Sequence, residues 1–574
     1  MRRRTSLAAA AAFSVTWALA ACGIPSGKSP EVIGDAPSDF DAASGTTPEE
    51  FLPTNDAGET VQNYLKAAAG DAEGRNDRLL AFTEAEQEFS DASSGMDLLA
   101  DKSITLESED SVSAVLEVTG SIVGRYLPDG SVLMHSVPRQ YAEKFILERE
   151  GFSEAWAITE KPEQVVLDYS YFTQSYERAP LYFQAGLKDL LVPDLRWIYR
   201  DLEPEAERLL LLGWLIQGPS DFTSFSARNA IPEGASAKSP NVDGTVQVEF
   251  AIGEELDGDT VEAIAAQVAW SLGLESEFAL VIDGENVREG SLGDWRDWNA
   301  IPNELRLQQN GYFIADERVW EYTTDQQVTD TSTDHLWVGF GVDGLRQVAV
   351  DAGGQIAAIV AGPDGDVLQV GAVGTTTREV TAELGGDLSD PQWLGADAVL
   401  VIDGGMPKAV YLNSGSVQEL SVGTDVTSIA IAADGRRLAY VEDGLAWVAA
   451  VSVDADGNIQ ASAPKQIGLD ITEVADVAWS SENYLWIAGQ RDNEKLFRVA
   501  LDNSRTEVQD GIGGLVIDQI AANPADPVES TLNRGEPVLV VSGGILYRVQ
   551  NVGLDAVVAD DQQVQATAPF MVLQ

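Results

Sequence analysis

The first folded region is marked by a change from helical to strand-like spacing of its apolar residues. Apolar residues recur at helical intervals over residues 59–69 and again over 77–89. Apolar and polar residues then alternate as in strands, over 103–107, 112–123, 139–147 and 154–159. Asp129-Gly130 lies between two of these runs and is typical of a hairpin turn. We therefore expect a small α+β domain at residues 58–170, with helices packed on an antiparallel sheet.

Residues 178–300 follow with an alternation of strand and helix patterns. Glu203-Pro204-Glu205 is typical of a helix start, and Gly218-Pro219 is typical of a helix end. The predicted elements are strands at 181–183 and 191–193, a helix at 206–217, a strand at 246–250, a helix at 260–272 and a strand at 278–282. This order predicts a compact α/β domain.

Helical spacing disappears in the last region, residues 302–574. Short apolar runs there alternate with turn pairs such as Asp443-Gly444. Similar four-residue segments recur at 347–350, 390–393, 428–431, 476–479 and 518–521. Their last residues lie 43, 38, 48 and 42 positions apart. A spacing near 43 residues is one four-stranded blade, so we expect an all-β propeller of five to seven blades. A pair of β-sandwiches is the alternative.

The amino terminus has the pattern of a secretory signal peptide, residues 1–21. Three arginines precede a short apolar run, and small residues precede Cys22. The apolar run is shorter than the roughly 20 residues that span a bilayer. Leu19-Ala20-Ala21-Cys22 resembles the lipobox of bacterial lipoproteins, and Cys22 is the only cysteine. The resemblance implies cleavage between Ala21 and Cys22, with S-diacylglycerol and N-acyl (palmitate-type) modification of Cys22. An ordinary signal peptide with a free thiol is the alternative.

A lipid-modified Cys22 would anchor the protein on the outer face of the bacterial cell membrane. Two or more acyl chains are needed for stable anchoring, since one holds only marginally. Residues 22–57 are rich in Pro, Gly, Ser and Asp and are expected to form a flexible acidic tether. About 35 such residues reach roughly 30–35 Å. Packing of part of this stretch as a strand stays open, as does the choice between Sec and twin-arginine export.

The strongly acidic composition excludes some classes of partner. The net charge is −56 over 574 residues, and the only charges of the signal peptide are positive. Nucleic-acid binding requires Lys and Arg to neutralise phosphates, so we expect none. The same field opposes docking of the protein surface on anionic lipids. A hydrophobic content of 44% is ample for packed cores.

No catalytic constellation is predicted. His135 and His335 are the only histidines, and no G-x-S-x-G motif accompanies them. The stretch 339–344 matches G-x-G-x-x-G, but a strand-like run follows it where a dinucleotide site needs a helix. Residues 454–458 are more typical of a hairpin turn than of a calcium loop. We expect no cofactor, no metal site and no enzyme activity, although the many carboxylates leave a glycoside-cleaving pair open.

The most specific residues of the chain lie in its second region. They are Leu181-Tyr182-Phe183, Leu191-Val192-Pro193-Asp194-Leu195-Arg196, Leu215-Ile216-Gln217-Gly218-Pro219-Ser220 and Ala230-Ile231-Pro232-Glu233-Gly234. This series is similar to the GerMN module of spore-germination proteins. Together with the lipobox, tether and propeller repeats, it makes nearly the whole mature chain resemble the LpqB family of actinobacterial lipoproteins.

The resemblance implies an accessory regulator of an Mtr-type two-component sensor kinase, with a role in cell-envelope homeostasis. It identifies no partner-binding residue. A second hypothesis is a cell-wall or glycan-binding lipoprotein, with its ligand in the GerMN-like cleft or the propeller's central opening. A third is a propeller enzyme acting on envelope sugars. The aromatics Tyr169, Tyr171, Phe172 and Tyr176 could stack on sugars, but we expect them to pack between domains.

Overall fold

The computed structural model describes most of the chain after residue 50. The described ranges are 51–83, 95–151, 154–161, 164–186, 189–238, 245–301, 310–323, 327–331, 344–351, 353–381, 383–454, 457–528, 538–559 and 562–572. Across these ranges, every helix is too short or too polar to cross a membrane.

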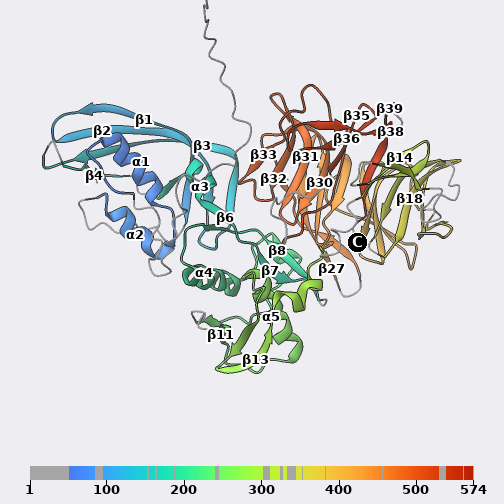
Figure 1. The fold of residues 1–574 in the computed structure, drawn as a ribbon, viewed down its shortest axis with the longest axis horizontal. Helices are drawn as coiled ribbons and strands as arrows, with labels where there is room; N and C mark the ends of the chain where they lie inside the picture. Colours follow the sequence, from blue (N-terminus) through green and yellow to red (C-terminus); the bar gives the residue numbers. More distant parts are fainter. Residues whose placement is uncertain are drawn as a thin grey trace, which may run out of the picture. The chain divides into compact units, whose positions relative to one another are not determined.

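The first domain is a curved sheet with helices packed on it, coloured blue to cyan in Figure 1. Its elements are α1 (Ala57–Ala67), α2 (Ala72–Leu80), β1 (Met96–Glu109), β2 (Ser113–Tyr126), β3 (Val132–Glu148), β4 (Ala157–Glu160) and β5 (Val166–Asp168). The sheet order is β4-β3-β2-β1-β5, in which only β5 runs parallel to its neighbour. The predicted helix at 77–89 begins earlier and ends at Leu80; residues 84–94 lie outside the described residues.

Folded contacts begin inside the stretch that was expected to be tether. Phe51 packs against the first domain's core, and the Trp156 backbone N–H donates to the Thr54 carbonyl at 2.8 Å. Asp56 caps α1 by accepting from the Glu59 N–H at 2.8 Å. The apolar face of α1, including Val61 and Leu65, is buried on the sheet.

The predicted aromatic cluster packs between domains. It lies on α3 (Tyr169–Ser175) and at the start of β6 (Tyr176–Arg178). The rings of Phe172 and Tyr176 are buried with centroids 4.8 Å apart. Tyr169 Oη donates to the Ser504 carbonyl of the propeller at 2.7 Å. These contacts support the packing interpretation of the aromatic residues over sugar stacking.

The middle domain has the predicted order of strands and helices. Its elements are β7 (Leu181–Gln184), β8 (Leu191–Asp194), β9 (Trp197–Tyr199), α4 (Pro204–Gln217), the 3-10 helix η1 (Thr223–Phe225), β10 (Ser236–Ala237), β11 (Val246–Ala251), α5 (Gly258–Ser271), β12 (Phe278–Ile282), β13 (Glu285–Gly290) and the 3-10 helix η2 (Leu292–Trp298). Strands β10-β11-β12-β13 form one sheet, with β11 and β12 parallel, while β7 and β8 form a separate hairpin.

Six antiparallel blades follow in the described residues after 309. From inner to outer strand, the first is β40 (Thr567–Met571), β14 (Gly311–Ala315), β15 (Arg318–Tyr322) and β16 (Val328–Asp330). The second and third are β17 (Leu345–Val350), β18 (Gln355–Gly362), β19 (Gly365–Ala372), β20 (Arg378–Glu379), and β21 (Leu388–Leu394), β22 (Ala398–Asp403), β23 (Met406–Tyr411), β24 (Val417–Glu419). The fourth is β25 (Val426–Ile431), β26 (Arg437–Glu442), β27 (Leu445–Val453), with β28 (Ile459–Ala461) and β29 (Lys465–Ile467) on its edge. The fifth and sixth are β30 (Thr472–Ser481), β31 (Tyr484–Arg491), β32 (Glu494–Ala500), β33 (Thr506–Val508), and β34 (Gln519–Ala522), β35 (Val538–Ser542), β36 (Ile545–Val549), β37 (Leu554–Ala556). A two-stranded extension pairs β38 (Val558–Ala559) with β39 (Gln562–Gln563).

The inner strands close a ring. Each of β17, β21, β25, β30 and β34 contacts the next, and β40 contacts both β34 and β17. Because β40 comes from the end of the chain and pairs with β14 at the start of the region, the first blade joins both ends of the propeller (Figure 1). This arrangement excludes the alternative of two β-sandwiches.

The predicted repeats are the inner strands, with one error of register. The sequence pattern places the fifth segment at 518–521, whereas the equivalent strand β34 is Gln519–Ala522. Gln519 lines the channel, while Asp518 is exposed and accepts from the Gly543 N–H at 2.7 Å. A one-residue shift exchanges the two faces of a strand, so the error would have put the wrong side chain in the channel.

Candidate functional sites at the domain junction and in the propeller channel

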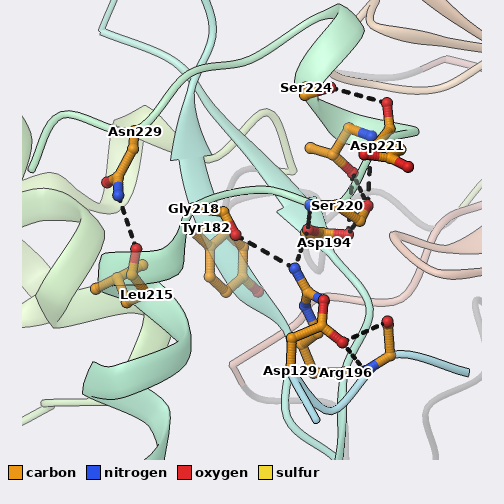
Figure 2. Close-up of polar contacts among 12 residues, drawn as sticks. Asp129, Tyr182, Asp194, Arg196, Leu215, Gly218, Ser220, Asp221, Ser224 and Asn229 are labelled. Carbon is orange, nitrogen blue, oxygen red and sulfur yellow. Dashed lines mark hydrogen bonds and ion pairs between the residues drawn. The ribbon is translucent and has the colours of Figure 1, made fainter. Parts of the chain in front are cut away.

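The acidic residue of the GerMN-like motif is saturated by protein donors. Asp194 ends β8 and accepts from the Ser220 N–H at 2.6 Å, Ser220 Oγ at 2.7 Å and Thr223 Oγ1 at 3.0 Å. Arg196 Nη2 donates to the same carboxylate at 2.8 Å (Figure 2). Four donors around one carboxylate leave little room for a ligand there.

Arg196 links the first and middle domains. Its side chain is fully buried and pairs with both Asp194 and Asp129, the latter in the β2–β3 turn (Figure 2). Burial opposes ionisation of Asp129, but Arg196 and hydrogen bonds from Ser131 outweigh it and lower the pKa of Asp129. The buried cation therefore holds two carboxylates from different domains in place.

The β2–β3 turn, which contains Asp129, is tightly packed against the middle domain. Gly130 adopts φ +80°, and a Cβ there would lie 2.5 Å from the Trp214 ring. Trp214 Nε1 donates to the Pro128 carbonyl at 2.8 Å, and the Gly130 carbonyl accepts from the Trp197 N–H at 2.8 Å. Any residue other than glycine would clash here.

Asn229 and Gln267, which lie outside the motif, connect two of its stretches and hold the middle domain together. Asn229 Nδ2 donates to the Leu215 carbonyl at 2.8 Å, at the end of α4 (Figure 2). Asn229 Oδ1 accepts from Gln267 Nε2 of α5 at 2.9 Å, and Gln267 Oε1 accepts from the Ala230 N–H at 2.7 Å. The residues that make the motif recognisable therefore serve the fold and the junction.

Buried polar contacts also join the middle domain to the propeller. Glu482 accepts from Tyr182 Oη at 2.8 Å and from Asn299 Nδ2 at 2.5 Å. Arg296 of η2 pairs with Asp526 at 2.7 Å. Burial raises the pKa of Glu482, against the effect of these donors. The propeller, the middle domain and the first domain are thus connected by hydrogen bonds that are shielded from solvent.

A cavity of about 840 Å³ occupies the centre of the propeller. The inner strands line it along their length, and Arg296, Asp297, Asn299 and Ala300 from the end of the middle domain also border it. Its wall includes a series of alanines: Ala349, Ala430, Ala478 and Ala521. These small side chains leave the channel open where larger ones would fill it.

Polar side chains on five of the six inner strands of the described blades join neighbouring blades. Asp390 accepts from Gln347 Nε2 at 3.2 Å and from the Ile429 N–H at 3.2 Å. Asp476 accepts from Ser428 Oγ at 2.5 Å and from the Ile520 N–H at 2.6 Å. Gln519 Oε1 accepts from the Ala568 N–H of β40 at 2.8 Å. We call Gln347, Asp390, Ser428, Asp476 and Gln519 the channel ring.

The two carboxylates of the channel ring resist ionisation. Burial raises the pKa of Asp390 to about 6. Burial and the negative charge of Asp390 raise the pKa of Asp476 to about 7. Both carboxyls are enclosed by protein yet accessible from the channel interior. In the part of the chain that the structure describes, their hydrogen-bond donors are neutral and neither forms an ion pair.

Sequence reasoning did not identify the channel ring as a site. The signal was present, because four of the five predicted repeats begin with polar residues of the channel ring: Gln347, Asp390, Ser428 and Asp476. The residues that sequence reasoning did single out at the amino terminus, Ala21 and Cys22, lie outside the described residues. So do His335 and 339–343.

Two family models match the folded regions. The model described as "Lipoprotein LpqB beta-propeller domain" matches residues 327–554, and the model described as "Sporulation and spore germination" matches 180–288. Proteins named "Lipoprotein LpqB" are similar over most of the chain. The one from Rhodococcus opacus is 24% identical and covers 88% of each chain. The chain is thus a relative of the LpqB lipoproteins over most of its length.

Further proteins named "Lipoprotein LpqB" show the same level of similarity. The protein from Corynebacterium jeikeium is 26% identical over 75% of this chain and 74% of its own. The protein from Mycolicibacterium smegmatis is 24% identical over 88% of this chain and 90% of its own. Among solved structures, virginiamycin B lyase from Staphylococcus aureus covers 42% of this chain and 82% of its own, at 9% identity and a TM-score of 0.28. A TM-score of this size supports no argument.

Proposed function

We propose that the mature protein begins at Cys22 and is held by its acyl chains on the outer face of the cell membrane. The lipobox-like Leu19-Ala20-Ala21-Cys22 supports this anchor. The name "Lipoprotein" carried by the relatives supports it as well. The tether then lets the folded domains stand away from the bilayer.

Replacing Cys22 tests the anchor. The wild-type protein is expected in the membrane fraction, with an intact mass above that of the polypeptide from residue 22. Protease added to intact spheroplasts should degrade it. Cys22→Ala removes the thiol that would carry the diacylglycerol, so it should abolish the added mass and the processing. A Cys22→Ala protein that is still cleaved at the same bond and retained on the membrane would overturn the anchor.

The anchored protein acts as an accessory regulator by contact with the extracytoplasmic domain of a sensor kinase of the Mtr type. The observation that carries this proposal is the joining of three domains by buried contacts: Arg196 with Asp129, Tyr182 with Glu482, and Arg296 with Asp526. A body built in this way can present residues from several domains to one partner. It changes the kinase only if it binds one kinase state more tightly than the other.

Titration of residues 23–574 against the purified kinase domain tests this function. Saturable binding is expected, and weaker binding at high salt would indicate that the acidic surface is the contact. No binding at about 50 μM, with a folded partner, would overturn the proposal. It would favour the alternative, a cell-wall-binding lipoprotein without kinase contact.

Two arginine variants test whether the kinase recognises the first domain, the middle domain and the propeller as one assembled body. Arg296→Ala breaks the buried pair with Asp526, while Arg200→Ala breaks an exposed pair with Glu177. Both remove one positive charge, so they change long-range electrostatics equally. Weaker binding is expected for Arg296→Ala alone. Equal binding by both variants would contradict recognition of the assembled body.

A further inference from the structure

The propeller channel has the dimensions and the partial polarity of a small-molecule site. Pockets that hold drug-sized ligands have volumes of roughly 300–1,000 Å³, with mostly apolar walls and a few placed polar groups. The channel cavity of about 840 Å³ fits this description, with alanines along its wall and four residues of the channel ring, Gln347, Asp390, Asp476 and Gln519, in its lining. Neither the family models nor the proposed kinase contact assigns a ligand to it.

The charge inside the channel indicates what kind of ligand fits. Asp390 and Asp476 face the cavity and are stabilised only by neutral donors in the described residues. A carboxylate offers about four acceptor sites, so each can accept further hydrogen bonds. A ligand cation placed between them would supply the countercharge that the protein does not provide, at low effective dielectric.

An ammonium group fits this position better than a metal ion. Among the described residues no group of three or more His, Cys, Asp or Glu side chains could hold a metal. Calcium takes six to eight oxygen ligands, which two carboxylates with other donors bound cannot offer. An ammonium needs only three acceptors. Asp390, Asp476 and the carbonyl oxygen of a neighbouring ring amide are of the right chemical type.

The rest of the cavity suits an organic skeleton. Ala349 and Ala430 give it a smooth, largely apolar wall. Gln392 also lines the channel, and its amide forms no hydrogen bond with any residue that the structure describes. It is therefore available to a polar group of the ligand.

We propose that the propeller channel binds a small organic amine, with its ammonium between Asp390 and Asp476 and its skeleton against the alanine-lined wall. A ligand that fills the channel also reaches Asn299 and Ala300 at the end of the middle domain. Asn299 donates a hydrogen bond to Glu482, so a ligand in the channel would affect the contact that joins the middle domain to the propeller. The site stands independently of any kinase contact.

Matched pairs of amine and alcohol test the proposal. The probes are 2-phenylethylamine against 2-phenylethanol, and glucosamine against glucose, added to residues 23–574 and followed by calorimetry and ligand-observed NMR. At least one amine should bind saturably and about tenfold more tightly than its neutral partner. The pair that responds distinguishes an aromatic or aliphatic amine from an amino sugar. Absence of saturable amine binding below about 10 mM, or equal binding of amine and neutral partner, overturns the proposal.

Three variants locate the binding. Asp476→Asn removes one charge of the pair and should weaken amine binding about tenfold or more. Asp518→Asn removes an exposed carboxylate beside the ring, outside the cavity lining, and should bind as the wild type. If Asp476→Asn fails to fold, Ala430→Leu decides, since it narrows the cavity and keeps both carboxylates. Unchanged amine binding by Ala430→Leu overturns the channel as the site.

Discussion

Asp194 at the domain junction and Asp476 in the propeller channel are both withdrawn from bulk water, but they have different partners. Asp194 has a buried arginine, Arg196, and three further donors within 3.0 Å. Asp476 has a serine hydroxyl and backbone N–H groups, and its nearest charged influence is another carboxylate, Asp390. At the junction, the charge of Asp194 is neutralised by Arg196 inside the protein. In the channel, the carboxyl group of Asp476 has no such partner among the described residues and faces an open cavity.

The comparison distinguishes a buried carboxylate that stabilises the fold from one that can still bind a ligand. A buried ion pair with every lone pair satisfied holds its surroundings in one arrangement, and removing one partner is costly. A buried carboxylate without a cation prefers its protonated form and is stabilised by any cation that reaches it. The recognisable sequence motif therefore marks the junction, while the carboxyl groups without a cation partner in the described residues lie in the propeller.

The largest expected effect is the loss of the junction cation. Arg196→Met leaves Asp194 and Asp129 without their shared countercharge and should cost about 3–5 kcal/mol of unfolding free energy. The first domain and middle domain should then unfold at lower urea concentration. The matched control is Arg200→Met, which breaks an exposed pair with Glu177 and should cost less than about 1 kcal/mol. Similar urea midpoints for the two variants would contradict the distinction between buried and exposed pairs.

Packing provides the second contrast. Gly130→Ala puts a Cβ 2.5 Å from the Trp214 ring at a positive φ, and overpacking of this kind costs about 1–3 kcal/mol. Ala430→Leu adds more atoms, but at a half-buried residue of the cavity lining, so it should cost less than about 1 kcal/mol. Thermal melting of both variants measures the contrast. A larger loss for Ala430→Leu than for Gly130→Ala would show that the channel is not open in solution.

The propeller was predictable because each of its repeats is recognisable from a short stretch of sequence. Five of the six inner strands in the described blades carry a polar residue at a spacing near 43, as at Gln347 and Asp390. The helix Pro204–Gln217 was predictable for the same reason, since its start and stop residues lie next to it in sequence. Local patterns of this kind depend on secondary structure alone.

Features set by distant pairing were not predictable. The pairing of β40 with β14 joins residues more than 250 positions apart, and no local pattern signals it. The ring position of Gln519 was missed by one residue because Asp518 is also polar, and only the pairing of β34 with β35 decides which of them faces the channel. The contact of Tyr182 with Glu482 joins two domains and likewise has no sequence pattern.

The last expected effect is a change in how stability depends on pH. The pKa of Asp476 is about 7 in the folded protein, against about 3.9 for an unfolded aspartate. Between these values the folded state binds more protons than the unfolded state, so this group makes stability fall as pH rises from about 4 to about 7. Asp390, with a pKa of about 6, acts in the same direction over a narrower range. Above about pH 7 the contribution is constant.

Asp476→Asn isolates this contribution. In the wild type, two backbone N–H groups donate to the Asp476 carboxylate. In the variant, the asparagine NH2 group faces one of these N–H donors and cannot accept from it. The variant is therefore expected to have a lower melting temperature than the wild type at pH 5. From pH 5 to pH 8 the wild type should lose stability relative to this variant, at roughly 2–4 °C of melting temperature per kcal/mol. Asp518→Asn, an exposed carboxylate beside the ring, should follow the wild-type profile. A saturating amine ligand should flatten the wild-type profile as the asparagine does, because it supplies the missing countercharge. Parallel profiles for wild type and Asp476→Asn would mean that Asp476 is already ionised at pH 5, and the contrast between channel and junction would then be wrong.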